Sequence, residues 1–377
     1  MPVTPDMLRS RIRSAMSVRG VSQQALARAI GLDATALSKA LNGARNFKSL
    51  EVALIAEHLE LSASDLLSDS PAPPVAVAAR AQPDASPALQ AALARVNFLL
   101  ELHRLLTDLG FDWHATVLDD PLRSGTAHDQ GVALAERVRR AMGIGDNDLP
   151  YQLSDLCDLL ERSFGLDIGF EPLPDGLDGL SVASDGLAAA LVSSGISATR
   201  QRFTIAHELG HLMAGDSQDL LVDEDVFGTK SRAETRANAF AAAFLMPERA
   251  VRTAVPHGVS EEIVAALLGR FGVSLDALAF RLHNVGVVNS AGRDRIRSLS
   301  SNRIALRSGR VADLQARNDR RAPGTLLGRT IEAYVQAKVS VRPLADLLQI
   351  HPDVLLDELT PPSGRTTPQD DSEGYAL

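Results

Sequence analysis

The chain has 377 residues, of which 45% are hydrophobic and 23% charged, a composition typical of globular proteins. A chain of this length is too long to fold around a single hydrophobic core, so we expect two or three domains. No apolar run approaches the roughly 18 to 20 residues that span a bilayer, and the first residues lack the apolar segment of a signal peptide. Cys157 is the only cysteine, which excludes an intrachain disulfide. We therefore expect a cytoplasmic protein that does not interact with a membrane.

The net charge of −9 is unevenly distributed along the chain. Residues 1–50 carry eight Arg or Lys side chains and two acidic ones, a net charge of +6, whereas the remainder carries −15. A basic head on an acidic body predicts that only the head meets a polyanion.

Residues 21–43 predict two short helices joined by a tight turn. Ser22 and Asp33 stand where N-caps are expected, and Gly31 supplies the turn between the helices. The apolar spacing predicts one buried face, made of Ala25, Leu26, Ala29, Ile30, Leu37 and Leu41.

This segment resembles the Cro/CI-type (XRE family) helix-turn-helix, and the resemblance covers about residues 4–67. We therefore assign residues 1–67, the head, to an all-α domain that binds double-stranded DNA, with its second helix in the major groove. The alternative is a small helical module that binds protein, but charge and motif coincide here, which favours DNA. The resemblance places Gln23, Ala34, Thr35 and Lys39 at the DNA, with Asn42 and Arg45 near its phosphate backbone.

Two connecting segments follow. Residues 68–88 hold five prolines and no amphipathic period, which predicts an extended, partly disordered tether. Residues 89–130 start with a long helix that has a broad apolar face. We expect this connector to pack on the domain that follows, although it could also form a homodimer.

From residue 131 the pattern is that of an α+β domain. Asp185-Gly186 predicts the two-residue type I′ turn of a hairpin. The expected elements are helices at 131–142 and 152–164, a strand at 165–173, the hairpin at 179–194 and a helix at 197–215.

The last of these helices contains the sequence TIAHELGHLMAG, residues 204–215. Residues four apart share one face of a helix, so His207 and His211 can reach one metal ion. Glu208 can address a water molecule at that ion without being a ligand. The alternative is a pair of core histidines that are satisfied without a metal and a carboxylate that is there by chance.

A catalytic zinc needs a third protein ligand and one open position. Glu234 in the helical segment 231–247 is our candidate, with Asn238 one turn later to orient a ligand histidine. Because Ser231 and Glu234 also have the spacing of a capping box, a purely structural role stays open. The competing ligands are Asp216, Asp223, Glu224 and Asp225.

Three segments, RQRFTIAHELGHLMAGD, AETRANAFAAAFLMP and VSLDALAFRLHNVGVV, resemble the ImmA/IrrE family of metallopeptidases, over about residues 131–290. The resemblance implies a zincin-like, gluzincin-type α+β core, to which we assign residues 131–260. It also implies that His207, His211 and Glu234 hold the metal and that Glu208 is the catalytic base. Zinc is the expected ion, with manganese as the alternative. The implied substrate is a protein, a helix-turn-helix repressor.

The C-terminal region, residues 261–360, is expected to be helical, and residues 361–377 to be a disordered tail. Residues 339–359 align without gaps on residues 21–41, at an offset of 318. The second helix of this copy carries Asp353, Asp357 and Glu358, which DNA phosphates would repel. We expect a packing or interaction unit shaped like a helix-turn-helix.

The sequence as a whole predicts a multidomain, mainly α protein in which a DNA-binding regulator is fused to a zinc-dependent endopeptidase. It would control gene expression by limited proteolysis of a repressor. The alternative is a regulator whose metal site is sensory or structural, without proteolysis. His257 and His283 are weak candidates for stabilising the oxyanion.

Overall fold

The structure is a computed structural model, and it describes the chain over eight stretches of sequence. It divides into two compact units, residues 1–85 and 86–377, which we describe separately. The described residues are 4–18, 21–59, 66, 87–116, 124–216, 232–256, 258–310 and 319–359.

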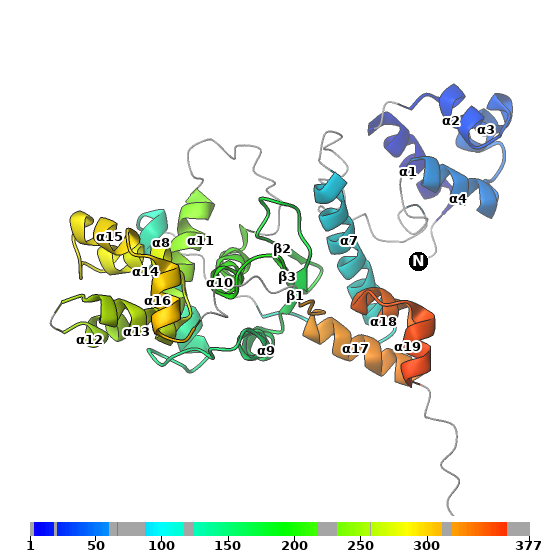
Figure 1. The fold of residues 1–377 in the computed structure, drawn as a ribbon. Helices are drawn as coiled ribbons and strands as arrows, with labels where there is room; N and C mark the ends of the chain where they lie inside the picture. The colour runs from blue at the N-terminus through cyan, green and yellow to red at the C-terminus, as the bar shows by residue number, and fades with distance from the viewer. Residues whose placement is uncertain are drawn as a thin grey trace, which may run out of the picture. The chain divides into compact units, whose positions relative to one another are not determined.

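The described residues of the first unit form a bundle of four helices (Figure 1). The side chain of Ser22 accepts a hydrogen bond from the backbone N–H of Ala25, and that of Asp33 accepts from Thr35 and Ala36. Gly31 has a φ of +66°, as a turn between two short helices requires. The sequence prediction for this motif is confirmed, with α1 at Pro5–Val18, α2 at Gln23–Ala29, α3 at Ala34–Leu41 and α4 at Ser49–His58.

The core of this unit differs from the predicted face at two positions. Ala25 and Ala29 are exposed, while Ala27 is buried beside Leu26. In a helix of seven residues a phase error of one position moves small side chains between the core and solvent. The buried side chains come from all four helices, and the largest are Ile12, Leu26, Leu37, Leu41 and Ile55.

The second unit contains a sheet of three strands in the order β1-β3-β2. Strand β1 (Asp167–Glu171) is parallel to β3 (Leu187–Ser193), and β2 (Gly179–Ser184) is antiparallel to β3. Asp185 and Gly186 have φ values of 53° and 88°, which are those of the predicted type I′ turn. The backbone of Arg321 pairs with Phe170 at the outer side of β1.

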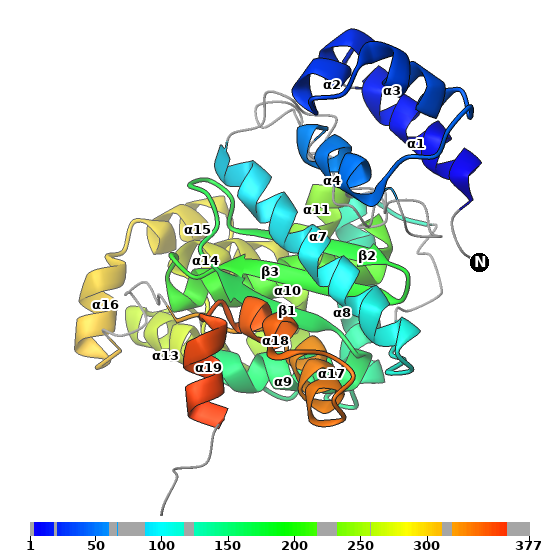
Figure 2. The ribbon, with the colours of Figure 1, turned by 90° about the vertical axis from the view of Figure 1, so that its right-hand side faces the viewer.

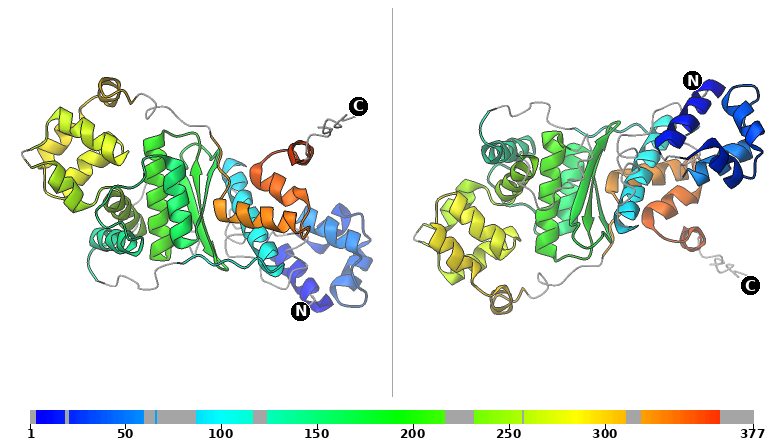
Figure 3. Two further views of the ribbon diagram at one scale, coloured as in Figure 1. Left: turned by 90° about the horizontal axis from the view of Figure 1, so that it is seen from below. Right: turned by 90° about the horizontal axis from the view of Figure 1, so that it is seen from above.

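Helices cover both faces of the sheet. On one face α10 (Ala198–Ala214) packs on β2 and β3, and on the other α7 (Pro87–Asp108) and α17 (Gly324–Val335) lie side by side (Figures 2 and 3). The expected multidomain, mainly α fold with a small α+β part is confirmed. The other helices in the described residues are α8 (Ala127–Ala141), α9 (Leu153–Phe164), α11 (Arg232–Leu245), α12 (Glu248–Ala254), α13 (Glu261–Phe271), α14 (Leu275–Asn284), α15 (Ser290–Arg297), α16 (Ser301–Arg307), α18 (Val341–Leu348) and α19 (Pro352–Leu359).

Polar contacts fix α7 and α17 to the sheet and to each other. Arg104 of α7 forms an ion pair with Asp185 at the hairpin turn. Arg329 of α17 donates to the side chain of His103 and to the carbonyl of Phe111. The connector helix therefore packs on its own unit, as the sequence analysis expected.

The N-terminus of α17 is held by two buried carboxylates. The backbone N–H of Gly324 donates to Glu161, at 2.9 Å, and that of Leu326 donates to Oδ1 of Asp167, at 2.8 Å. The other carboxylate oxygen of Asp167 is buried and has no hydrogen-bond partner within the described part of the chain.

The C-terminal repeat extends further than the sequence alignment did. At the same offset of 318 residues, α17, α18 and α19 correspond to α1, α2 and α3. Ser340 caps α18 as Ser22 caps α2. Gln349, with a φ of 55°, replaces Gly31 at the turn, and its side chain bonds to Glu171 and Arg320. These two bonds hold a residue without glycine's freedom in a left-handed conformation.

Within the described stretches no single helix is long and apolar enough to cross a membrane. Helices α13 and α14 meet that test only when taken together, and they are bent by 104°. Several predictions lie outside the described residues: the tether up to residue 86, the tail from residue 361, Ser231, His257, and the competing ligands Asp223, Glu224 and Asp225.

Candidate metal centre

Helix α10 carries the HELGH sequence and is anchored at its first turns. Gln201 donates to the carbonyl of Ser193, which ties the helix start to the end of β3. Arg202 is 2% exposed and donates to the carbonyls of Phe271 and Pro150. Burial lowers the pKa of Arg202 to about 10, so this arginine stays charged at neutral pH and fixes the rotation of α10.

Two glycines allow the helices of the site to approach closely. A Cβ on Gly210 of α10 would lie 3.0 Å from the ring of Phe240 in α11. A Cβ on Gly131 of α8 would lie 2.3 Å from the carbonyl oxygen of Arg236 in α11. Helix α11 can therefore lie directly against α10, which brings Glu234 to the two histidines.

His207, His211 and Glu234 lie close together, with one ligand atom from each within 4.8 Å of the others. The two Nε2 atoms of the histidines are 3.1 Å apart. Glu234 lies 3.3 Å from His207 Nε2 through Oε2 and 3.1 Å from His211 Nε2 through Oε1. Ligand atoms at tetrahedral positions around zinc are separated by about 3.3 Å. The donor set and its spacing both fit a bound zinc ion.

The electrostatics of the three side chains favour a cation between them. Burial alone would lower the pKa of His211, but hydrogen bonds with Asp216 and Glu234 raise that pKa to about 10. Hydrogen bonds from His207 and His211 hold the pKa of Glu234 well below its usual range. The acidic groups thus stabilise positive charge at the position that a divalent ion would take.

The described contacts show a further acidic residue beside His211, Asp216, which follows the end of α10. Its carboxylate lies 3.4 Å from Nδ1 of His211 and forms an ion pair with Arg236 of α11. Arg236 also donates to Gln130 of α8, at 3.4 Å. Sequence reasoning named Asp216 only as a competing ligand, because its contact with Arg236 depends on the packing of α10 on α11.

Asn238, predicted to orient a ligand histidine, makes a different contact. Its side-chain amide donates to the backbone carbonyl of Glu234 in the same helix, at 2.8 Å. That Asn238 helps to arrange the metal site stays a prediction, and the contact through which it would do so is the one with Glu234. His283, a weak candidate for stabilising the oxyanion, lies 3.3 Å from the hydroxyl of Ser290.

Glu208 is 7% exposed and faces the beginning of strand β2. A Cβ on Gly179 would lie 2.9 Å from Oε1 of Glu208. Within the described part of the chain, neither a hydrogen bond nor an ion pair of this carboxylate is found. The carboxylate is thus placed by packing and remains available to a water molecule.

The head presents most of its predicted DNA contacts to solvent. Arg45 differs, because it is partly buried, donates to the carbonyl of Ala36 and forms an ion pair with Glu51 at 2.9 Å. Arg45 therefore joins α3 to α4, a contact that its place in the sequence did not predict. The exposed candidates are Gln23, Ala34, Thr35, Lys39 and Asn42.

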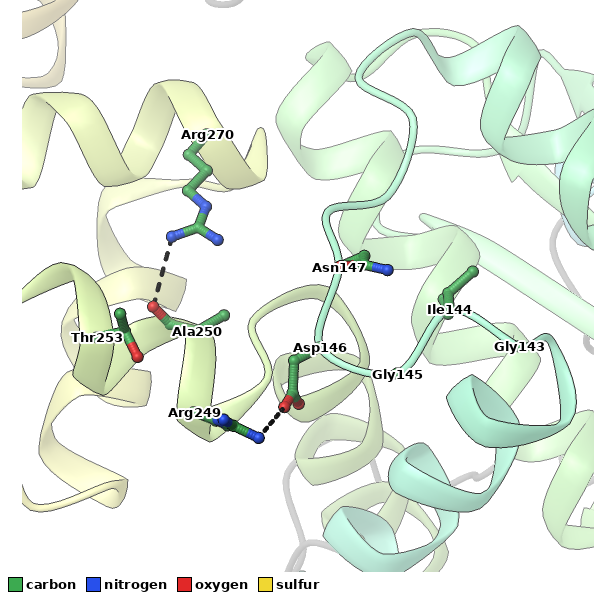
Figure 4. A pocket seen from close by; sticks show the side chains of 9 residues that line it. All are labelled: Gly143, Ile144, Gly145, Asp146, Asn147, Arg249, Ala250, Thr253 and Arg270. Carbon is green, nitrogen blue, oxygen red and sulfur yellow. Dashed lines mark hydrogen bonds and ion pairs between the residues drawn. The ribbon is translucent and has the colours of Figure 1, made fainter.

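A cavity of about 540 Å³ lies between the loop after α8 and helices α12 and α13 (Figure 4). Its two arginines are both paired, Arg249 with Asp146 and Arg270 with Asp148. His207, Glu208, His211 and Glu234 do not line this cavity. Because its charges are balanced internally, this cavity has no evident anion specificity.

Comparison with known proteins finds a match within each unit. Residues 162–283 match the family model of the IrrE N-terminal-like domain, and residues 19–66 match a helix-turn-helix model. One stretch of the chain is therefore similar to a helix-turn-helix domain, and a second stretch is similar to the IrrE N-terminal-like domain. The match to the IrrE N-terminal-like domain includes His207, Glu208, His211 and Glu234. It is shorter than the resemblance expected from the sequence, which covered about residues 131–290.

The chain is similar to the radiation response metalloprotease IrrE of Deinococcus radiodurans, with 35% identity over 158 residues. That match covers 41% of this chain and 43% of the relative, so the chain spans less than half of the relative's length. Among solved structures, a transcriptional regulator of Mycobacterium tuberculosis is 21% identical, with a TM-score of 0.30. That match covers 52% of this chain and 54% of the regulator's chain.

Proposed function

We propose that this protein is a DNA-binding regulator fused to a zinc-dependent endopeptidase, and that it controls transcription by limited proteolysis of a helix-turn-helix repressor. One observation carries the proposal. His207, His211 and Glu234 converge with the spacing of zinc ligands, and the buried Glu208 lies on α10 with the two histidines, where its carboxylate has no hydrogen-bond partner among the described residues.

Five residues would divide the work of peptide hydrolysis. His207, His211 and Glu234 would hold the ion, and Asp216 would orient His211 through Nδ1. Zinc, when bound, lowers the pKa of water toward about 7 and polarises a carbonyl group. Glu208 would take the proton of the attacking water and pass it to the leaving amine.

Charge and exposure of the head support DNA as the second partner. The predicted contacts Gln23, Thr35 and Lys39 are exposed side chains in or beside α2 and α3. A basic head on an acidic body would bring the peptidase to a promoter, where a repressor on a neighbouring operator would be its substrate. Assignment of residues 1–67 to DNA and 131–260 to proteolysis is part of this proposal.

The test compares the wild-type protein with Glu208→Gln in its host cells. Both proteins should bind about one metal ion each, because Glu208 is not a proposed ligand. We expect at least one cellular repressor to be cut only with the wild type. Glu136→Gln, which neutralises an exposed carboxylate on α8, is the matched control and should behave as wild type.

Two results would contradict the proposal. If Glu208→Gln keeps both cleavage and regulation, Glu208 is not the catalytic base. If cleavage of cellular proteins is the same in both strains while metal removal abolishes DNA-dependent regulation, the metal site is sensory or structural.

A further inference from the structure

The beginning of strand β2 lies unusually close to the proposed catalytic base. A Cβ built on Gly179 would lie 2.5 Å from Cγ2 of Thr204, 2.9 Å from Oε1 of Glu208 and 3.2 Å from Cγ of Glu208. Thr204 and Glu208 are one turn apart on α10, so the missing side chain of Gly179 leaves room for both.

The chain is held at Gly179 and at the preceding Asp178, which opposes movement of the strand away from α10. Gly179 pairs with Val192 of β3. The carbonyl of Asp178 accepts a hydrogen bond from the backbone N–H of Ser193, at 2.7 Å. The carboxylate of Asp178 accepts from Arg200 at the start of α10, at 2.5 Å. Any atom added at position 179 would therefore press on α10 side chains rather than displace the strand.

Glu208 is the side chain that would yield. Its carboxylate ends a flexible chain, whereas Thr204 is β-branched and 6% exposed, with few rotamers available. Because the described contacts of Glu208 include no hydrogen bond from the protein, its carboxylate is positioned by the surface that Gly179 leaves open.

We propose that Gly179 is a positioning residue for catalysis: its bare backbone sets where the Glu208 carboxylate stands relative to the metal centre. This inference rests on the proposed function. The metal ligands are not among the nearest contacts of a Cβ at position 179. A side chain at this position should therefore misplace the base and leave metal binding intact.

Gly179→Ala tests the proposal, and Gly195→Ala is the matched control. Gly195 precedes α10, and its nearest contact for an added Cβ is an ordinary 3.8 Å. Misplacement of a reacting group by about 1 Å can reduce a rate by roughly 100-fold. We expect Gly179→Ala to retain its zinc, measured by mass spectrometry of the purified protein. Its kcat/KM for the cleaved repressor should fall at least 10-fold, and Gly195→Ala should remain within 2-fold of wild type.

Two further variants separate positioning from packing. In a Glu208→Gln background, Gly179→Ala should have no additional effect on the residual rate, because the group it acts through is absent. Thr204→Ser removes Cγ2 and relieves the closest contact, so Gly179→Ala combined with Thr204→Ser should regain thermal stability but not rate.

The outcomes are distinct. Recovery of the rate in the combined variant would overturn the proposal, because the loss would come from packing against Thr204. So would loss of zinc in Gly179→Ala when Thr204→Ser is also present, or an unchanged rate in Gly179→Ala. Failure of the proposed function itself would show differently, as equal cleavage by the wild type and Glu208→Gln.

Discussion

Replacing Asp167 by Asn should change how the stability of the protein depends on pH. Asp167 begins β1, is fully buried, and accepts the N–H of Leu326 through Oδ1 while Oδ2 has no described partner. Burial, with a smaller contribution from the charge of Glu161, raises the pKa of Asp167 from 3.8 to about 7. Asn keeps the acceptor at Oδ1 and cannot ionise.

The sign and size of the effect follow from linkage. A carboxyl group whose pKa is raised by folding binds its proton more tightly in the native state. The wild type should therefore gain stability as the pH falls from about 7 to about 4. A difference of about 3 pKa units corresponds to about 4 kcal/mol, at 1.36 kcal/mol per unit. Asp167→Asn should lose this dependence, so its stability relative to wild type should be about 4 kcal/mol more favourable at pH 8 than at pH 4.

The assay is urea unfolding followed by the fluorescence of Trp113, which is the only tryptophan and belongs to this unit. Its indole N–H donates to the carbonyl of Gly165, two residues before Asp167. Asp155→Asn, at an exposed position on α9, is the matched control and should follow the wild type. Parallel stability curves for Asp167→Asn and wild type from pH 4 to 8 would refute the reasoning.

Three further predictions concern the two functional units. Glu234→Gln should release most of the metal while the fold persists; full metal retention with a loss of only about 1 kcal/mol of stability would mean that Glu234 merely caps α11. Residues 1–67 alone should bind DNA with an affinity that falls steeply with salt, and residues 339–359 alone should not bind; a head without sequence-selective binding at any salt would be a protein-interaction module. Removing residues 1–68 should impair cleavage of a repressor on its operator if the head delivers the peptidase, and accelerate it if the head blocks the active site. Equal rates for both proteins, with and without operator DNA, would contradict both interpretations.

Features encoded within a few residues could be predicted from the sequence. The caps at Ser22 and Asp33 and the turn at Asp185-Gly186 depend on local backbone chemistry, and the i, i+4 spacing alone places His207 and His211 on one face. Glu234 was one candidate ligand among several acidic residues, and the family resemblance favoured it, because nothing local fixes how α11 lies on α10.

Features that depend on distant packing could not be predicted. The pairing of Asp216 with Arg236 depends on how α11 packs on α10, and Gly179 meets Glu208 only where the sheet touches α10. The correspondence of α17 with α1 was also missed. The residue types differ at corresponding positions of these helices: Ile12 corresponds to Thr330, and both are buried.

The two corresponding sets of three helices, α1–α3 and α17–α19, differ in which helix is held most firmly. In the head, α3 buries Leu37, Ala40 and Leu41 and belongs to the centre of the bundle. In the C-terminal copy, α17 is fixed by buried carboxylates, while α19 buries only Leu355. An isolated helix of eight residues is not stable in water, so α19 should open with a free energy far below that of global unfolding. Its amide hydrogens should exchange first, and those of α17 among the last. A partner that binds α19 would therefore contact a helix that can change its conformation, next to a helix, α17, that is held in place.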